Sequence, residues 1–579
     1  MIHLNLNIFI VGLLYYILSY ILDFTIAIDV ALQTQKGIIY GRQTQYSTEY
    51  LGIQYAKVSR WKPPIDLVSD TFLNGTFYAT SFGPCCPQRP AGIYIDRQDE
   101  QCLYLNIFTP IGVSNQSLLP VLVWIHGGGL QSGCSSQSIP TLYNGTNIIA
   151  NSPQQLAIIV TINYRLGVLA DMYLPALIEE NSSNWPTAGN YYYLDMLSAL
   201  RWINKNIRDY GGNPNNVLLF GESSGANAVV DIGALKGSLN LYQHIIAQSG
   251  GAGHYLYYSN VSDAIGVSNT VVQQMNCTSE SNSLVLSCLR NSSIQNLINA
   301  YGNRQTKPII DGYFFPFYPP LAIQNGKYNP NITMIMGNNE YEHLICFENP
   351  DMNSTDAISM INQVIGPKWS PLVINYYQLN SCSSNRNATN RCCNVIRLLL
   401  MDKFFDCSVL RIYKNLYMKY QQQQQSQKLF WYHLDCNPGI CPQLSVEEGA
   451  GICAHTQEIP YVFGTISTYS SMNSYNCTWD NQTRKFSNEI ISHWINTART
   501  GEPLQSWSMY FPTAEKYFQI TPYYESSAQP WNRNCSVFDQ IEEEETRLMF
   551  QMNSGHYRTI NKIILFYIIV FQMKSFIIN

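Results

Sequence analysis

The sequence has little charge. Lys, Arg, Asp and Glu together make up 13% of its 579 residues, and the formal net charge is −5. A mildly acidic chain lacks the basic clusters that bind nucleic acid, so we expect no nucleic-acid partner. The nine histidines do not combine with cysteines at the spacing of a zinc finger. We therefore expect neither a metal ion nor a cofactor.

Long apolar runs occur at the two ends of the chain. Residues 8–22 are almost all apolar and predict a signal peptide over residues 1–27, cleaved after Ala27. No Lys or Arg precedes this run, so an uncleaved signal anchor stays open as an alternative. The tail, residues 551–579, is also apolar but short for a bilayer; it is either a glycolipid-anchor signal or a helix docked on the body. Membrane attachment through either terminus is therefore an open alternative.

Cysteine, by contrast, is abundant. Sixteen cysteines are typical of a protein that folds in an oxidising compartment, so we expect a secreted or extracellular protein. N-x-[ST] sequons point the same way, although a chain rich in Asn and Ser contains many of them by chance. The candidate glycosylation sites are Asn74, Asn144, Asn260, Asn291, Asn353 and Asn481.

The most informative stretch is Gly221-Glu222-Ser223-Ser224-Gly225, which follows an apolar, strand-like run over residues 217–220. This is the G-x-S-x-G pattern of a nucleophile elbow, a tight strand-to-helix turn that lifts a serine hydroxyl clear of a sheet. The glycines suit a turn in which a Cβ would collide with the neighbouring element. Because a chain with 36 glycines produces this pattern by chance in a fair fraction of cases, its surroundings must decide.

Those surroundings alternate strand with helix. Residues 121–125 and 158–165 contain continuous apolar runs, typical of strands that are buried on both faces of a parallel sheet. A helical stretch over residues 194–207 leads towards the elbow strand. The pattern predicts an α/β protein with a central, mostly parallel, twisted sheet and helices on both faces.

Eight segments then carry a resemblance that covers nearly the whole chain. In order they are CLYLNIF from Cys102, HGGG from His126, NYRLGV from Asn163, YGGNPNNVLLFGESSG from Tyr210, AQSG from Ala247, IIDGYFFP from Ile309, HTQEIPYVFG from His455 and SHWINTARTGEP from Ser492. Through these eight segments the chain resembles the type-B carboxylesterase/lipase family. Its members are α/β-hydrolases and include the cholinesterases. The resemblance implies one α/β-hydrolase domain over residues 28–550.

The resemblance also implies a catalytic triad. Serine is a poor nucleophile at neutral pH and needs a base, which a third group orients. In this fold the order along the chain is Ser, acid, His, which assigns Ser223 as nucleophile and His455 as base. The acid matches Glu342 by spacing, with Glu340 as a competitor. His343 stands where the family pattern has glycine.

The oxyanion hole is expected from three backbone N–H groups, those of Gly128, Gly129 and Ser224. The family usually has Ala at the last position. Because the donor is main chain, we expect Ser224 to contribute only its backbone.

Structural pairs follow from the same resemblance. Arg165 should pair with Asp195, and Arg60 with Glu100. The disulfides implied by the family pattern are Cys86–Cys102, Cys277–Cys288 and Cys407–Cys535. Cys85 adjoins Cys86 and is an alternative partner for Cys102, and the remaining cysteines, including Cys436, Cys441 and Cys453 near His455, leave further bridges open.

The expected function is hydrolysis of a small carboxylic ester through an acyl-Ser223 intermediate. Cholinesterases hold the quaternary ammonium of their substrate over a tryptophan in the loop of the first disulfide. Here the loop from Cys86 to Cys102 contains only Tyr94 as an aromatic residue, which disfavours choline esters. The alternative is a catalytically inactive adhesion or partner-binding ectodomain, because fold alone does not establish catalysis.

Overall fold

The structure, a computed structural model, describes the chain from residue 28 to residue 552 with short gaps. The gaps are residues 91–93, 138–140, 155, 181–182, 344, 422–426, 437–452, 466–479, 505–506 and 523–525. The predicted signal peptide over residues 1–27 and the apolar tail from residue 553 onwards lie outside the described residues. Among the helices that are described, none is both long and apolar enough to cross a membrane.

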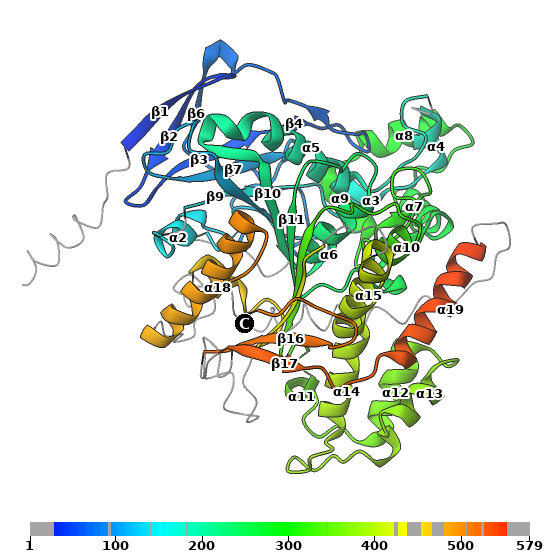
Figure 1. Cartoon of the computed structure of the whole chain (residues 1–579). Helices are drawn as coiled ribbons and strands as arrows, with labels where there is room; N and C mark the ends of the chain where they lie inside the picture. Colours follow the sequence, from blue (N-terminus) through cyan, green and yellow to red (C-terminus); the bar gives the residue numbers. More distant parts are fainter. Residues whose placement is uncertain are drawn as a thin grey trace, which may run out of the picture.

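One large mixed sheet runs through the molecule (Figure 1). Its strands, in spatial order, are β1 (Ile28–Thr34), β2 (Gly37–Gln43), β3 (Ser47–Gln54), β7 (Tyr104–Pro110), β9 (Ile158–Ile162), β8 (Leu119–Ile125), β10 (Gly212–Glu222), β11 (His244–Gln248), β14 (Thr333–Asn339), β15 (Leu429–Leu434), β16 (Lys516–Ile520) and β17 (Ser527–Pro530). The block from β9 to β16 is parallel throughout, while antiparallel pairs flank it. A further strand, β6 (Thr76–Ala79), pairs with β2.

Alternate residues of the central strands enter two different hydrophobic cores. In β8, Val121 and Val123 face the first core, whereas Leu122 and Trp124 face the second. Both sets are almost fully buried, as the period of two along a strand requires when both faces are covered. The first core includes α5 (Tyr191–Asn206) and α6 (Ser224–Asp231); the second includes α2 (Gly145–Ala150), α16 (Ile459–Phe463) and α18 (Asn481–Thr500). The predicted architecture, with helices on both faces of the sheet, is confirmed.

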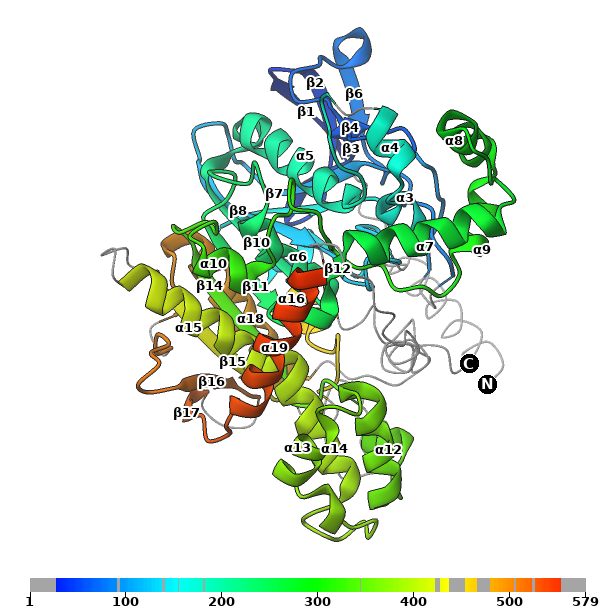
Figure 2. The ribbon, with the colours of Figure 1, turned by 90° about the vertical axis from the view of Figure 1, so that its right-hand side faces the viewer.

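The remaining helices surround this sheet. They are α3 (Val168–Asp171), α4 (Pro175–Glu180), α7 (Val261–Gln274), α8 (Asn282–Asn291), α9 (Ile294–Tyr301), α10 (Pro319–Gln324), α11 (Ile345–Glu348), α12 (Ser354–Ile365), α13 (Ser370–Tyr376), α14 (Cys392–Met401), α15 (Cys407–Gln421) and α19 (Ser536–Met552). Figures 1 and 2 both place α12, α13 and α14 together at the end of the molecule opposite β1, β2 and β6.

Seven disulfides occur among the described residues. They are Cys85–Cys134, Cys86–Cys102, Cys277–Cys288, Cys346–Cys393, Cys382–Cys392, Cys407–Cys535 and Cys436–Cys453. The three pairs implied by the resemblance are among them. Cys85, considered as an alternative partner for Cys102, is bonded to Cys134 instead. Cys441 lies outside the described residues.

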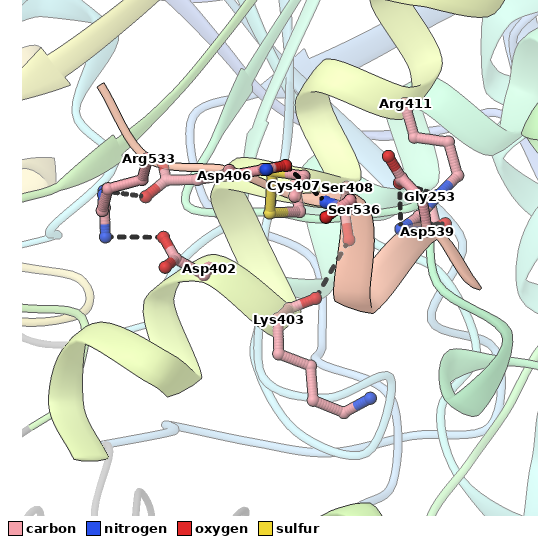
Figure 3. The surroundings of a disulfide bond; sticks show 12 residues. Gly253, Asp402, Lys403, Asp406, Cys407, Ser408, Arg411, Arg533, Ser536 and Asp539 are labelled. Atoms are coloured by element: carbon pink, nitrogen blue, oxygen red, sulfur yellow. Dashed lines mark hydrogen bonds and ion pairs between the residues drawn. A yellow bond between two sulfur atoms is a disulfide. The ribbon is translucent and has the colours of Figure 1, made fainter. Parts of the chain in front are cut away.

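The Cys407–Cys535 disulfide joins the first residue of α15 to the residue that precedes α19 (Figure 3). Ion pairs reinforce the junction on both sides. Arg533 lies 2.6 Å from a carboxylate oxygen of Asp402 and of Asp406, and Arg411 lies 2.9 Å from Asp539. The C-terminal helix is therefore fixed to the body both covalently and electrostatically.

Exposure separates the candidate glycosylation sites into two groups. The exposed asparagines are Asn74, Asn291, Asn353 and Asn481. Asn260 is 5% exposed and its side chain caps α7 by accepting from the backbone N–H of Asp263, which disfavours a glycan at this candidate. Asn144 is half-buried and caps α2 in the same way, through the N–H of Thr146.

The Arg165–Asp195 pair is buried in the protein core. The guanidinium donates to both carboxylate oxygens at 2.8 and 2.7 Å, and the side chains are 1% and 0% exposed. A buried pair of this kind is costly to break, because the remaining charge stays buried without a partner. The other pair that the resemblance implies, Arg60 with Glu100, is closer to the surface at 2.6 Å.

We predict that Asp195→Ala lowers the free energy of unfolding by about 3–5 kcal/mol, since it leaves the Arg165 guanidinium uncompensated. Urea denaturation under non-reducing conditions measures this change. The matched control is Glu502→Ala, which removes the half-exposed Lys428–Glu502 pair and should cost less than about 1 kcal/mol. Equal losses in the two variants would contradict the prediction.

Candidate active site

The site lies where parallel strands end together. Because β8, β10, β14 and β15 all run in the same direction, the loops that follow them meet at one edge of the sheet. The loop after β8 is the Gly loop, residues 126–129. The turn after β10 carries Ser223, and the loops after β14 and β15 carry Glu342 and His455. The predicted residues thus come from four separate stretches of the chain to one edge.

Ser223 occupies a sharp, strained turn between β10 and α6. Its φ is +57° and its ψ is −123°, a combination that non-glycine residues rarely adopt and that recurs at functional sites. Its N–H donates to the carbonyl of Gln248, and its own carbonyl accepts from Asn227. A Cβ added at Gly225 would lie 2.1 Å from the carbonyl oxygen of Ile125, so glycine is required where the turn crosses β8.

Glu342 and His455 are in direct contact. Glu342 Oε2 lies 2.6 Å from His455 Nδ1, and Glu342 Oε1 accepts from the backbone N–H of Asn339 at 2.7 Å. The carboxylate is buried. Burial raises the pKa of the competitor, Glu340, whose surroundings include Arg397 and Asp435. Of the two acids that the spacing left open, Glu342 is therefore the one that contacts the imidazole.

The opposite edge of the imidazole faces the elbow. His455 Nε2 lies 3.2 Å from Oε1 of Glu222, the residue that precedes Ser223. Glu458 is a third buried carboxylate nearby; it accepts from Asn339 Nδ2 at 2.6 Å. Sequence analysis missed both acids, although the charge at the second position of G-x-S-x-G was a visible signal for Glu222.

These carboxylates change the protonation of the base. Burial alone lowers the pKa of the His455 imidazole. The charges of Glu222, Glu342 and Glu458 outweigh that effect and raise the pKa to about 9. Burial also raises the pKa of the Glu222 carboxyl. The 3.2 Å approach of Glu222 Oε1 to His455 Nε2 thus brings together two groups whose pKa values are both raised.

The Gly loop runs directly over the nucleophile. A Cβ at Gly127 would lie 3.0 Å from the Cβ of Ser223, so the two backbones approach closely. Gly128 and Gly129 have φ values of +104° and +64°, in the region that favours glycine. A Cβ at Gly129 would meet no atom of the described residues within 4 Å, so this part of the loop borders open space.

The side chain of Ser224 also takes part in the site. Its Oγ accepts from the backbone N–H of Leu130 at 3.2 Å, and so ties the elbow to the end of the Gly loop. At the start of the loop, Tyr164 OH donates to the carbonyl of His126 at 2.6 Å. The prediction that Ser224 contributes only its backbone is therefore wrong. The hydroxyl satisfies a buried N–H that alanine, usual in the family, would leave without this partner.

His343, at the position of the family's glycine, is not a second base. Burial, together with the nearby charge of His455, lowers its pKa to about 3, which keeps the ring neutral. It packs against Phe405 with ring centroids 5.7 Å apart, and Phe405 in turn packs against His455 at 6.2 Å. His343 thus contributes to the apolar wall behind the imidazole.

Comparisons with known proteins identify the family of the chain. The sequence profile of the carboxylesterase family matches residues 29–538. The chain is 27% identical over 533 residues to pyrethroid hydrolase Ces2e of Rattus norvegicus, with 84% of each chain covered. It is 26% identical over 490 residues to para-nitrobenzyl esterase of Bacillus subtilis, which covers 81% of this chain and 90% of the relative.

Solved structures show the same fold. A carboxylesterase of Geobacillus stearothermophilus superposes with a TM-score of 0.70 at 24% identity, over 88% of this chain and 99% of the other. A structure of a PNB esterase also gives a TM-score of 0.70, at 23% identity and the same coverage. The predicted α/β-hydrolase fold and the predicted resemblance are both confirmed, since a family profile that spans most of the sequence is matched by the fold. The chain belongs to the carboxylesterase family.

Proposed function

We propose that this protein hydrolyses carboxylic esters through a covalent acyl-enzyme on Ser223, with His455 as the general base and Glu342 as the acid that orients it. The observation that carries the proposal is the 2.6 Å contact between Glu342 Oε2 and His455 Nδ1, at the sheet edge where the elbow presents Ser223. Nucleophile, base and orienting acid are the parts that this chemistry requires. Family membership supports the same reaction class.

The proposed steps use these residues in turn. The Ser223 hydroxyl attacks the ester carbonyl while His455 Nε2 accepts its proton, and the tetrahedral intermediate then expels the alcohol with that proton. Water repeats the sequence on the acyl-enzyme and releases the carboxylic acid. Glu342 holds the Nδ1 proton throughout, which leaves Nε2 as the edge that exchanges protons with the serine.

Backbone donors are proposed to stabilise the oxyanion. The N–H groups of Gly128, Gly129 and Ser224 belong to the loop and the helix start that border Ser223. Donors fixed in advance stabilise the developing negative charge, and each is worth about 3–4 kcal/mol in comparable enzymes. The hydrogen bond from Leu130 to the Ser224 hydroxyl helps to hold two of these donors at a fixed separation.

The substrate class is proposed to be small neutral esters. The relatives are named for the hydrolysis of pyrethroid and para-nitrobenzyl esters, so short-chain aryl esters are suitable probes. A choline ester is disfavoured because Tyr94, the single aromatic residue in the Cys86–Cys102 loop, is 52% exposed. An exposed ring offers a cation little of the desolvation that strengthens a cation–π contact.

A location in the secretory pathway is proposed as well. Seven disulfides among the described residues suit an oxidising compartment and would not persist in a reducing cytosol. Glycans in that compartment would be carried by the exposed asparagines Asn74, Asn291, Asn353 and Asn481.

The first test of the function is Ser223→Ala. Wild type should hydrolyse a short-chain aryl ester and gain the mass of one organophosphate, and the variant should do neither because the attacking oxygen is gone. The matched control is Ser238→Ala, a buried serine that binds the carbonyl of Leu235 outside the site. If the folded wild type neither hydrolyses the ester nor gains the label, the proposed catalysis is refuted. That result would favour the binding-ectodomain alternative.

The second test separates the two candidate acids. Glu342→Gln should lower kcat by about 10³- to 10⁴-fold, because an amide neither fixes the tautomer nor stabilises the imidazolium. Glu340→Gln should change kcat by less than about tenfold, since Glu342 is the carboxylate that contacts the imidazole. Steady-state kinetics of both variants on one aryl ester measures the difference. The reverse order of effects would assign the acid to Glu340.

The third test is the pH dependence of kcat/KM. Catalysis needs the neutral imidazole, so a His455 pKa of about 9 predicts that kcat/KM rises with pH up to that region. Glu222→Gln removes a negative charge beside Nε2, lowers the pKa of His455 and should shift the acid limb to lower pH. Glu502→Gln, at the surface, should leave the limb in place. An unshifted limb in Glu222→Gln would refute this account of the base.

A further inference from the structure

The backbone around His455 is irregular. His455 lies in a turn after an isolated bridge between Tyr341 and Ala454, not in a helix or a strand. The next residue, Thr456, has a φ of +74°, which is unfavourable for a β-branched side chain. A strained turn keeps its shape only where its surroundings impose it. The base of the proposed triad thus depends on contacts outside its own turn.

Contacts before His455 converge on two residues. The N–H of Tyr341 donates to the carbonyl of Cys453 at 3.0 Å, and Asn339 Nδ2 donates to the carbonyl of Ala454 at 2.8 Å. Both donors come from the end of β14 and the loop that carries Glu342. Two hydrogen bonds therefore hold the base loop, residues 453–458, against the acid loop, residues 340–343.

A disulfide completes this attachment. Cys436 follows the end of β15 by two residues, and Cys453 precedes His455 by two residues. The two Cα atoms are 5.1 Å apart and both cysteines are buried, with exposures of 1% and 0%. β15 pairs with β14 up to Leu434 and Asn339. The disulfide therefore links the base loop to the end of this strand pair.

We propose that the Cys436–Cys453 disulfide is a positioning element of the active site, which holds His455 at hydrogen-bond distance from Glu342. The inference rests on the proposed function. Neither sulfur touches the reacting atoms; the disulfide acts through the backbone of the base loop. It is not among the three disulfides that the resemblance implies.

The physical reason is the precision that proton transfer requires. His455 Nδ1 and Glu342 Oε2 are 2.6 Å apart, and a misplacement of about 1 Å in a catalytic group can lower the rate about 100-fold. The disulfide spans a sequence separation of 17 residues, and without it the base loop would be tied to β15 only through that length of chain. A covalent link restrains the backbone more tightly than the two hydrogen bonds do alone.

The other loops of the site have disulfides close by as well. Cys134, bonded to Cys85, follows Gly129 by five residues, and Cys346, bonded to Cys393, follows Glu342 by four. Cys277–Cys288 differs, because it joins the turn after α7 to α8 at the periphery (Figure 2). With a sequence separation of 11 residues it is a suitable matched control.

The test compares two double variants of the full chain with wild type. In Cys436→Ala/Cys453→Ala we expect kcat to fall about 10- to 100-fold, with KM within about twofold and slower organophosphate labelling of Ser223. The acid limb of kcat/KM should also move to lower pH, because a displaced imidazole loses the charges of Glu222, Glu342 and Glu458, while His343 stays neutral. Cys277→Ala/Cys288→Ala should keep kcat, KM and the limb of wild type.

Two results would overturn the inference: a folded Cys436→Ala/Cys453→Ala variant with wild-type kcat, or an equal loss of kcat in the control. If the variant does not fold, graded reduction of wild type with peptide mass mapping replaces it. Loss of kcat in step with opening of Cys436–Cys453, reversed by reoxidation, supports the proposal; full activity after that pair has opened refutes it. A wild type that neither hydrolyses esters nor labels at Ser223 refutes the proposed function instead, so the two failures are distinguishable.

Discussion

The close approach of the elbow to β8 is the constraint on which the rest of the site depends. A Cβ at Gly225 would lie 2.1 Å from the carbonyl of Ile125, and one at Gly221 would lie 2.6 Å from the Gly225 carbonyl carbon. Only a backbone without side chains can turn this tightly, and the turn forces Ser223 to a φ of +57°. The Gly loop begins at the residue that follows β8. The contact that presents the Ser223 hydroxyl therefore also brings the proposed oxyanion donors close to that hydroxyl. Ser223 and the Gly loop are therefore one structural unit, not two parts placed independently.

Glu342, His455 and Glu458, in contrast, lie in loops and turns and not in strands. One imidazole has three buried carboxylates around it, and each of those groups would be costly to bury alone. They are compatible because they share a few polar partners: Asn339 donates its backbone N–H to Glu342 and its side-chain amide to Glu458. That single asparagine, at the end of β14, sets the relative position of two acids. A protonated His455, 3.2 Å from Glu222 Oε1 and 2.6 Å from Glu342 Oε2, offsets part of the negative charge.

How much of this could be predicted from the sequence depends on the range of the contact. The elbow, the Gly loop and the strand alternation are local patterns, so Ser223, Gly128 and the parallel sheet could be predicted from short stretches. Spacing favoured Glu342 over its competitor Glu340, but the direction of the two side chains, which decides which one contacts the imidazole, could not be predicted from spacing. Glu458, the Ser224 hydroxyl and the Cys85–Cys134 disulfide depend on which backbones lie side by side in space, and no spacing rule contains that information. The burial of Asn260 could not be predicted for the same reason, since a sequon carries no information about burial.

Several disulfides lie close to the loops of the site that have irregular backbone, whereas the elbow has regular elements on both sides. Ser223 is held by a strand, a helix and glycine packing, and no described disulfide lies within the elbow. The Gly loop, the acid loop and the base loop lack such regular hydrogen bonding, and each has a disulfide within a few residues. A loop of irregular backbone has little resistance to small displacements, and small displacements are what proton transfer tolerates least. Cross-links near these loops add the rigidity that the strands already give to Ser223, and His455, whose turn contains Thr456 at a positive φ, has its disulfide closest in sequence.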